Sequence, residues 1–222
     1  MGKPIVYGPR YSVYTRAVLM ALIEKKIGFE EVYVEQATEE HRRPEHLKRH
    51  PFGLLPAFEH NGFMIYETVP ILHYIEEAFP GLRLTPADIH RRTRMAQIMA
   101  VINAYAARPL VWGVFALRAY PDPGRPVDEA AIAEKVKLGT HALKAIEDLM
   151  MSPDPFLVGR QISLADMLLE PMLFYLDKAP EGPSILAQVP KIAAWHAAMQ
   201  SVPSGVATVP KALLSSDAVV TR

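Results

Sequence analysis

Three groups that can bind charged ligands lie close together between residues 55 and 68. If the peptide bond before Pro56 is cis, the backbone N–H and C=O of Leu55 face outward like a free strand edge. Thr68 stands at a predicted helix start, where free N–H groups and the positive end of the dipole favour a carboxylate. Glu67, beside it, suits an ammonium group. Together these groups predict a site for a small zwitterionic peptide.

A loop, a hairpin and a helix start are predicted to position these groups. His-Pro-Phe-Gly at residues 50–53 is typical of a turn, because Pro fixes φ and Gly adopts conformations that other residues avoid. Pro56 opens a short strand, and Asn61-Gly62 is a strong hairpin signal. Thr68 is the predicted N-cap of the next helix, with Pro70 in its first turn. The alternative is an ordinary hairpin that leads into a surface helix.

The segment 51–58, the hairpin and Glu67-Thr68 before a helix resemble the glutathione-binding segment of cytosolic glutathione S-transferases. In that family the residue before the cis-proline pairs with the cysteinyl backbone of glutathione. An acidic residue followed by Ser or Thr holds the γ-glutamyl end. The resemblance assigns these contacts to Leu55, Glu67 and Thr68, with Pro56 in a structural role. Leu54 stands where the family often has Gln, which removes one expected polar contact.

The resemblance implies that glutathione attacks an electrophile as its thiolate, a form that is scarce at neutral pH because a free thiol has a pKa of about 8.5. Ser12 precedes Thr-Arg at the start of the first predicted helix, as in serine-type members of the phi- and theta-like kind, bacterial ones included. As a hydrogen-bond donor it is favoured over Tyr7, which ends the first strand as in tyrosine-type members. Otherwise Ser12 is a plain helix cap and Tyr7 a core residue.

The resemblance assigns further residues to the site, each with a simpler alternative. His41 and Arg42 fall where relatives place basic residues against the glycine carboxylate of glutathione, or else are solvated loop charges. Phe52 is the aromatic key that inserts into a partner subunit, or else packs locally. The expected electrophile pocket draws on hydroxyls near the first helix and on a later long helix, whose aromatics would otherwise be core residues: Tyr11, Tyr14, Tyr105, Arg108, Trp112 and Phe115.

Composition excludes several other classes of function. Lys+Arg and Asp+Glu number 24 each in 222 residues, so no net field attracts nucleic acid or an anionic membrane. The absence of cysteine excludes disulfides, a cysteine nucleophile and dithiol exchange. No histidine spacing indicates a metal site, and His41, His46, His50 and His60 are expected to be solvated. No apolar run approaches the ~20 residues of a membrane span. The first residues show no signal peptide, which favours the cytoplasm.

The order of predicted elements divides the chain into two domains. Residues 1–81 read as β-α-β-loop-β-β-α, which resembles a thioredoxin-like α/β domain. Residues 82–89 form a linker, and residues 90–222 are expected to be an all-helical domain with the electrophile pocket. A kink is expected in its first helix near Pro109. Ser163 and Asp166 form a predicted capping box, which resembles the folding box of glutathione transferase second domains.

These features predict a soluble two-domain glutathione S-transferase that forms a homodimer. It would conjugate glutathione, its co-substrate, to small hydrophobic electrophiles, or reduce organic peroxides with it. No metal, nucleic acid or membrane is expected to take part. One alternative is a scaffold of the same fold that binds protein partners without catalysis. Another is a specialised glutathione-dependent isomerase or dehalogenase.

Overall fold

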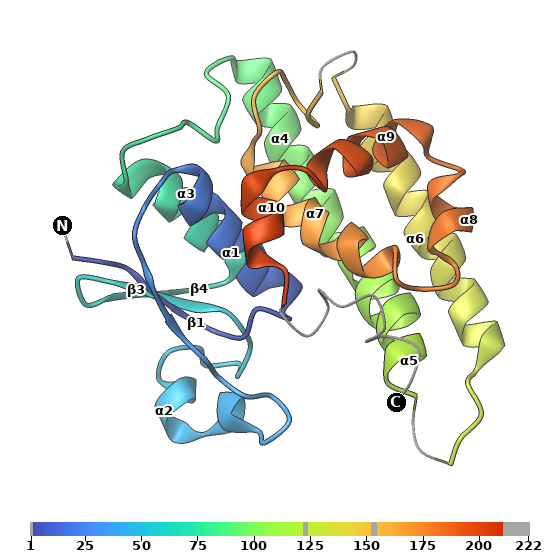
Figure 1. Cartoon of the computed structure of the whole chain (residues 1–222), viewed down its shortest axis with the longest axis horizontal. Helices are drawn as coiled ribbons and strands as arrows, with labels where there is room; N and C mark the ends of the chain where they lie inside the picture. Colours follow the sequence, from blue (N-terminus) through green and yellow to red (C-terminus); the bar gives the residue numbers. More distant parts are fainter. Residues whose placement is uncertain (1, 122–123, 152–154, 211–222) are drawn as a thin grey trace. The chain divides into compact units, whose positions relative to one another are not determined.

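The computed structural model describes residues 2–121, 124–151 and 155–210 (Figure 1). Its contacts group into two compact units. The first comprises the chain up to Leu84 together with Pro203–Pro210, and the second comprises Thr85–Val202. The predicted first domain ended at residue 81 and left residues 203–210 with the helices. The contacts instead end the first segment at Leu84 and return residues 203–210 to the first unit.

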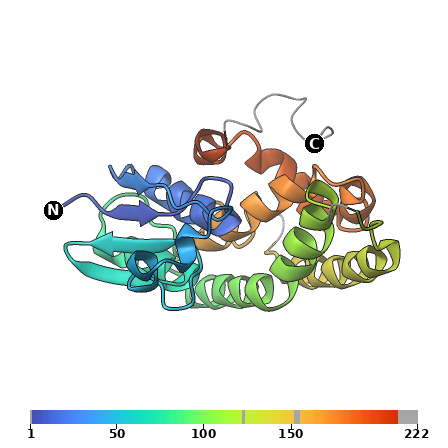
Figure 2. The same cartoon turned by 90° about the horizontal axis from the view of Figure 1, so that it is seen from below.

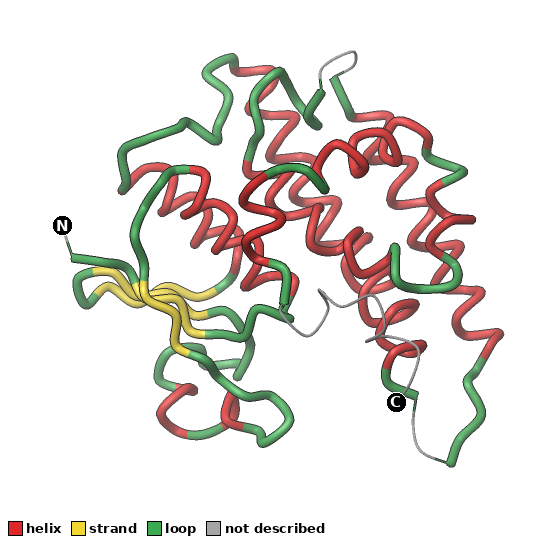
Figure 3. Tube along the Cα trace, viewed as in Figure 1, coloured by secondary structure: helices red, strands yellow, loops and turns green. Residues whose placement is uncertain are grey.

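The first unit contains a four-stranded mixed sheet in the order β2-β1-β3-β4. β1 pairs in parallel with β2 and antiparallel with β3, which pairs antiparallel with β4. Val6 on β1 lies opposite Phe58 on β3, and both are fully buried. Figure 3 shows the strands confined to this unit. The strands are β1 (Ile5–Tyr7), β2 (Glu30–Val32), β3 (Ala57–His60) and β4 (Phe63–Tyr66).

Helix α1 is buried along most of its length because two other helices pack against it. Figure 1 shows it between α3 and α10, and both contact it. The carbonyls of α10 accept hydrogen bonds from two arginines, Arg10 Nη1 to Ala207 O at 2.8 Å and Arg16 Nη2 to Gly205 O at 3.4 Å. The helices of this unit are α1 (Val13–Glu24), η1 (Glu40–Arg42, a 3₁₀ turn), α2 (Pro44–Leu47), α3 (Thr68–Ala78) and α10 (Pro203–Thr208).

Two local predictions in this unit are confirmed. The Leu55-Pro56 peptide bond is cis. Asn61 and Gly62, which join β3 to β4, have φ values of 52° and 79°. Positive φ at both central residues is the requirement of the tight hairpin turn that Asn-Gly favours. The sheet and helices of the first unit confirm its α/β fold class, and these two features confirm the predicted turns.

The described part of the second unit consists of helices and loops (Figure 3), which confirms the all-helical prediction. Figures 1 and 2 show the long helix that begins with α4 beside α6, and the two are in contact. The elements are α4 (Ile89–Val101), η2 (Ile102–Ala106), η3 (Arg108–Phe115), α5 (Ala116–Ala119), α6 (Glu129–Leu149), α7 (Leu164–Leu176), α8 (Gly182–Leu186) and α9 (Pro190–Met199).

The long helix changes its winding around Pro109, where the sequence predicts a kink. Segments η2 and η3 are π-helical, whereas α4 before them and α5 after them are α-helical. Proline lacks an N–H and its ring collides with the carbonyl four residues earlier, so a wider turn accommodates it. The helix is therefore irregular at the predicted position, and the irregularity is a π-helical segment.

Ile89–Ala119 is also long and apolar enough to cross a membrane, which corrects the expectation that no such segment exists. About 61% of its most apolar window is buried inside the protein. That degree of burial is typical of a core helix in a globular protein, which passes the same test of length and composition.

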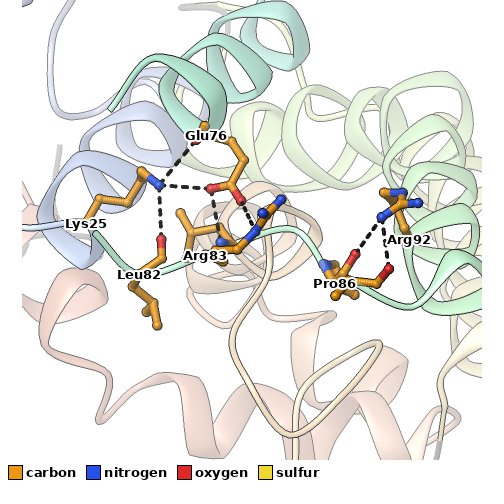
Figure 4. Close-up of polar contacts among 8 residues, drawn as sticks. Lys25, Glu76, Leu82, Arg83, Pro86 and Arg92 are labelled. Atoms are coloured by element: carbon orange, nitrogen blue, oxygen red, sulfur yellow. Dashed lines mark hydrogen bonds and ion pairs between the residues drawn. The ribbon is translucent and has the colours of Figure 1, made fainter. Parts of the chain in front are cut away.

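A buried ion pair joins the ends of α1 and α3 to the segment that leaves the first unit (Figure 4). Lys25 Nζ lies 3.0 Å from Glu76 Oε2, and each side chain is 2% exposed. The ammonium also donates to Leu82 O at 3.0 Å, and the same carboxylate accepts from Leu84 N at 3.1 Å. The pair therefore fixes the backbone on both sides of Arg83.

We expect Glu76→Gln to lower the free energy of unfolding by about 3 kcal/mol, because it leaves the Lys25 ammonium buried without a counter-charge. Urea denaturation followed by circular dichroism measures the loss. The double variant Lys25→Met/Glu76→Met is the control, since it removes both charges. It should lose less than Glu76→Gln alone, and an equal or larger loss would contradict the electrostatic explanation.

Candidate active site

The loop before β3 presents the backbone of Leu55, as the sequence predicts. The Leu55 side chain is buried with Tyr7, Val34 and Ala57. In the described part of the chain its N–H and C=O make no turn, loop or cap hydrogen bond to other backbone groups. The preceding residue is anchored, because its carbonyl lies 2.8 Å from His46 Nε2. The loop thus holds a free peptide edge in a fixed place, and the Leu54 side chain is 53% exposed.

Glu67, and not Thr68, is the N-cap of α3, which corrects the prediction. The Glu67 carbonyl accepts the first helical hydrogen bond, from Ile71 N at 3.1 Å, so Thr68 is already the first helical residue. Glu67 has φ 68° and ψ 126°, a backbone conformation that costs energy for a residue with a Cβ. The Glu67 side chain is 55% exposed, and the first turn of α3 contains no acidic residue. A carboxylate ligand and an ammonium ligand therefore find complementary groups at adjacent residues.

Ser12 is the N-cap of α1, and its hydroxyl donates no hydrogen bond to any residue that the structure describes. Its Oγ accepts a hydrogen bond from Thr15 N at 3.3 Å, and the backbone at Ser12 is extended. An accepting hydroxyl can still donate its own hydrogen. The first turn of α1 contains no acidic residue. The hydroxyl and the positive end of the helix dipole thus act in the same direction, favouring an anion beside Ser12.

Tyr7 is engaged elsewhere. Its side chain is buried, and its hydroxyl donates to Glu59 Oε2 at 2.7 Å. The Arg49 guanidinium lies 4.3 Å from the centre of its ring. Burial, and then the hydrogen bond to the Glu59 carboxylate, raise the pKa of the Tyr7 phenol. The hydroxyl hydrogen of Tyr7 is therefore already donated to Glu59 in this structure.

The two other tyrosines near α1 lie in different surroundings. The Tyr11 hydroxyl donates to Glu35 Oε1 at 3.1 Å and accepts from Gln36 N at 3.3 Å. Burial raises the pKa of Tyr14 to about 12, and the negative charge of Glu67 adds to that effect. Tyr14 therefore lies within electrostatic reach of the predicted ammonium site, whereas Tyr11 is tied to the loop after β2.

The expectation that the histidines of this unit are solvated is wrong for three of the four. His46, His50 and His60 are 2%, 2% and 5% exposed. His50 Nε2 lies 3.9 Å from Glu67 Oε1, a contact that sequence reasoning missed. The only sequence feature that could have indicated this contact was the place of His50 in the turn that precedes the cis-proline. His41 is partly exposed, and no cluster of metal-binding side chains occurs among the residues that the structure describes.

Arg42 stands on the surface of η1. Its guanidinium lies 3.2 Å from Glu39 Oε1, and both side chains are 69% exposed. An exposed pair of this kind is worth less than about 1 kcal/mol. The Arg42 guanidinium can therefore exchange Glu39 for a ligand carboxylate at little cost.

Of the four residues assigned to the pocket from the long helix, two line one cavity within the second unit. This cavity has a volume of about 530 Å³ and lies between the long helix and α6. Tyr105 and Arg108 belong to its lining, which is mostly apolar. Phe115 is buried with its ring 4.6 Å from that of Tyr175, and Trp112 is 48% exposed. The last two do not line this cavity.

Ser163 and Asp166 form the predicted capping box at the start of α7. Asp166 is completely buried and accepts four hydrogen bonds, from Leu157 N, Ser163 N, Ser163 Oγ and Trp195 Nε1 at 3.0, 2.8, 2.6 and 2.8 Å. Burial raises the pKa of the Asp166 carboxyl, and the four donors oppose this rise. The box therefore joins α7 to the loop before it and to α9.

Comparisons with known proteins agree with this arrangement. Residues 6–83 match the family model "Glutathione S-transferase, N-terminal domain", and residues 129–198 match "Glutathione S-transferase, C-terminal domain". The chain is 31% identical to glutathione S-transferase F10 of Arabidopsis thaliana, over 86% of this chain and 88% of the relative. It is 29% identical to the probable glutathione S-transferase GSTF1 of Oryza sativa subsp. japonica, over 90% of this chain and 92% of the relative.

Among solved structures, glutathione transferase F7 from Populus trichocarpa superposes with a TM-score of 0.82 at 28% identity, covering 92% of this chain and 97% of that one. Both halves of the chain and its fold thus agree with one family. The chain belongs to the glutathione S-transferases.

Proposed function

We propose that this transferase activates glutathione through Ser12, whose hydroxyl donates a hydrogen bond to the thiolate. The observation that carries the proposal is the difference in hydrogen bonding between the two candidate hydroxyls. Ser12 Oγ accepts from Thr15 N and retains its hydrogen, whereas the Tyr7 hydroxyl donates to Glu59. A hydrogen bond to an ionised group is worth about 1.5–3 kcal/mol. It lowers the thiol pKa and raises the fraction of reactive thiolate.

The remaining groups of the first unit are proposed to bind the rest of glutathione. The Leu55 backbone pairs with the cysteinyl backbone, and Glu67 takes the ammonium of the γ-glutamyl group. The N–H groups at the start of α3 and the Thr68 hydroxyl take its α-carboxylate. His41 and Arg42 face the glycine carboxylate. Reduced glutathione belongs to reducing compartments, so we place the protein in the cytoplasm.

The second substrate is proposed to be a small hydrophobic electrophile or an organic peroxide. With an electrophilic carbon, the sulfur forms the new C–S bond and the leaving group departs with its electron pair. With a peroxide, the sulfur attacks the terminal oxygen and the O–O bond breaks, which gives an alcohol and the sulfenic acid of glutathione. A second glutathione then displaces water from the sulfenic acid to form the disulfide. Both reactions need the thiolate, so they share the role of Ser12. Of the residues that the resemblance assigns to the electrophile pocket, Tyr11, Tyr14, Trp112 and Phe115 remain proposed for it. Tyr105 and Arg108 line the cavity beside Leu138, which is assigned below to the dimer interface.

Titration of bound glutathione tests the proposal. Ultraviolet absorbance of the thiolate, measured against pH, should give a thiol pKa at least about one unit below that of the free thiol, which is about 8.5. Conjugation of a chromogenic aryl halide should proceed over the same pH range. Binding of glutathione with no change in its thiol pKa would instead favour the non-catalytic scaffold.

We also propose that the chain forms a homodimer in which Phe52 enters the second copy. Phe52 is 71% exposed, and its ring is held edge-on to those of Tyr66 and His50. An exposed aromatic ring in a fixed orientation is typical of an interface anchor. The cavity of about 530 Å³ beside Leu138 is the apolar site that we assign to it.

Phe52→Ser is expected to convert the dimer to monomer at micromolar concentration, as measured by light scattering after size-exclusion chromatography. Loss of one central aromatic anchor costs about 2 kcal/mol or more of binding energy. Leu138→Glu, at a half-exposed position of the cavity, should do the same. Tyr120→Ser removes a ring that is 74% exposed and should leave the dimer intact. A Leu138→Glu dimer with a raised KM for the electrophile would assign the cavity to substrate instead.

A further inference from the structure

His50 is a buried imidazole next to the proposed ammonium site. It lies in the turn between α2 and β3, and its side chain is 2% exposed. Its ring centre is 5.0 Å from that of Tyr66 and 6.4 Å from that of His46, with which it stacks. Packing on both sides fixes the ring, and Nε2 lies 3.9 Å from Glu67 Oε1. A rigid group thus stands beside a carboxylate that is itself 55% exposed.

The separation of 3.9 Å is longer than a hydrogen bond, yet a small rotation of the exposed Glu67 side chain closes it. A neutral imidazole with its hydrogen on Nε2 can then donate to one carboxylate oxygen and leave the other for a ligand. A protonated imidazole acts differently, because its positive charge neutralises the carboxylate and repels a second cation. The two protonation states of His50 therefore have opposite effects on an ammonium at Glu67.

We propose that His50 is a positioning residue for glutathione: neutral, it orients Glu67 for the γ-glutamyl ammonium, and protonated, it competes with that ammonium. This inference rests on the proposed glutathione site. It adds a dependence of substrate affinity on pH that is separate from ionisation of the thiol.

The surroundings determine the pH range of the effect. Among the described residues, the titratable groups that face His50 are His46 from α2, Tyr66 at the end of β4 and Glu67. Burial, and then the positive charge of His46, lower the pKa of the His50 imidazole from its ordinary value of 6.5. Proton uptake by His50 opposes ligand binding. Affinity is therefore complete above this lowered pKa and declines as the pH falls through it.

Isothermal titration calorimetry of S-methylglutathione between about pH 5.5 and pH 7.5 tests the inference, because this ligand has no thiol whose ionisation on binding would also change the Kd with pH. The wild-type Kd should rise about fivefold toward the acidic end, the size expected for a partly exposed charge pair. His50→Gln keeps a neutral donor but cannot take up a proton. Its Kd should match that of the wild type near pH 7.5 and stay constant on acidification. His73→Gln, at an exposed histidine of α3, should follow the wild type.

Steady-state kinetics gives a second readout. Acidification should raise the KM for glutathione more in the wild type than in His50→Gln, in which only ionisation of the thiol contributes. A purely structural role of His50 would give both proteins the same pH profile. His50→Leu, which lacks a donor, should bind more weakly than His50→Gln at every pH. A His50→Gln variant that retains the acidic loss of affinity overturns the inference while the glutathione site stands. Wild-type protein that binds no glutathione at any pH overturns the proposed function and this inference together.

Discussion

Ser12→Ala is expected to lower kcat/KM for glutathione conjugation by about 10- to 100-fold, the kinetic equivalent of a lost hydrogen bond to an ionised sulfur. The thiol pKa of bound glutathione should rise toward that of the free thiol. The Kd for glutathione should change little near neutral pH, because most of the bound ligand is held by groups around Leu55 and Glu67. A loss in kcat/KM with a nearly constant Kd identifies a group that acts on the reacting sulfur.

The same substitution also removes a helix cap, so a second variant must separate the two roles. Ser12 Oγ accepts the Thr15 N–H, and loss of such a cap to alanine costs about 1 kcal/mol of stability. Glycine caps a helix within a few tenths of a kcal/mol of serine. Ser12→Gly should therefore be nearly as stable as the wild type and as inactive as Ser12→Ala, while Ser12→Thr should keep activity. Tyr7→Phe, whose hydroxyl donates to Glu59, should retain activity within about threefold. Full activity in Ser12→Gly with loss in Tyr7→Phe would move the thiolate contact to the strand.

Asp166→Ala is expected to lower the free energy of unfolding by about 4 kcal/mol or more, enough to prevent folding of the helical unit under mild denaturing conditions. The substitution leaves four donors without their acceptor in a fully buried position. Each buried donor without a partner costs about 1–3 kcal/mol, reduced where water enters. Urea denaturation followed by the fluorescence of Trp195 and Trp112 measures the change.

Asp128→Ala is the matched control for this prediction. Asp128 is also a helix-capping aspartate, at α6, but it is exposed and accepts one hydrogen bond, from Ala131 N at 2.9 Å. Its loss should cost about 1 kcal/mol. Equal losses in the two variants would show that Asp166 acts as an ordinary cap, and that its additional hydrogen bonds to Leu157 and Trp195 add nothing.

The sequence predicted those parts of the site that depend on local chemistry. The cis bond at Pro56, the Asn61-Gly62 turn and the Ser163–Asp166 box each depend on residues within a few positions of one another. The resemblance to a known family correctly extended these local features to the two-domain fold. Turns and capping boxes can be predicted from sequence because the residues that form them are close together along the chain.

The contacts that the sequence missed are those made across long separations. Polar neighbours in the sequence suggested a solvated His50, yet its ring is buried against Tyr66 and lies beside Glu67. Tyr7 and Glu59 are 52 residues apart, and only the sheet register shows that one donates to the other. Helix α3 begins one residue earlier than predicted, so Thr68 is its first residue and not its N-cap. This detail depends on which carbonyl accepts the first helical hydrogen bond.

The return of α10 to the first unit means that the unit which folds together is not continuous in the sequence. In topological terms the helical unit is an insertion between Leu84 and Pro203. A fragment that ends at Leu84 lacks the backbone carbonyls that Arg10 and Arg16 bind on α10, and it leaves the fully buried Arg16 guanidinium without that partner. The glutathione-binding unit therefore becomes complete only after the segment Pro203–Pro210 has been synthesised.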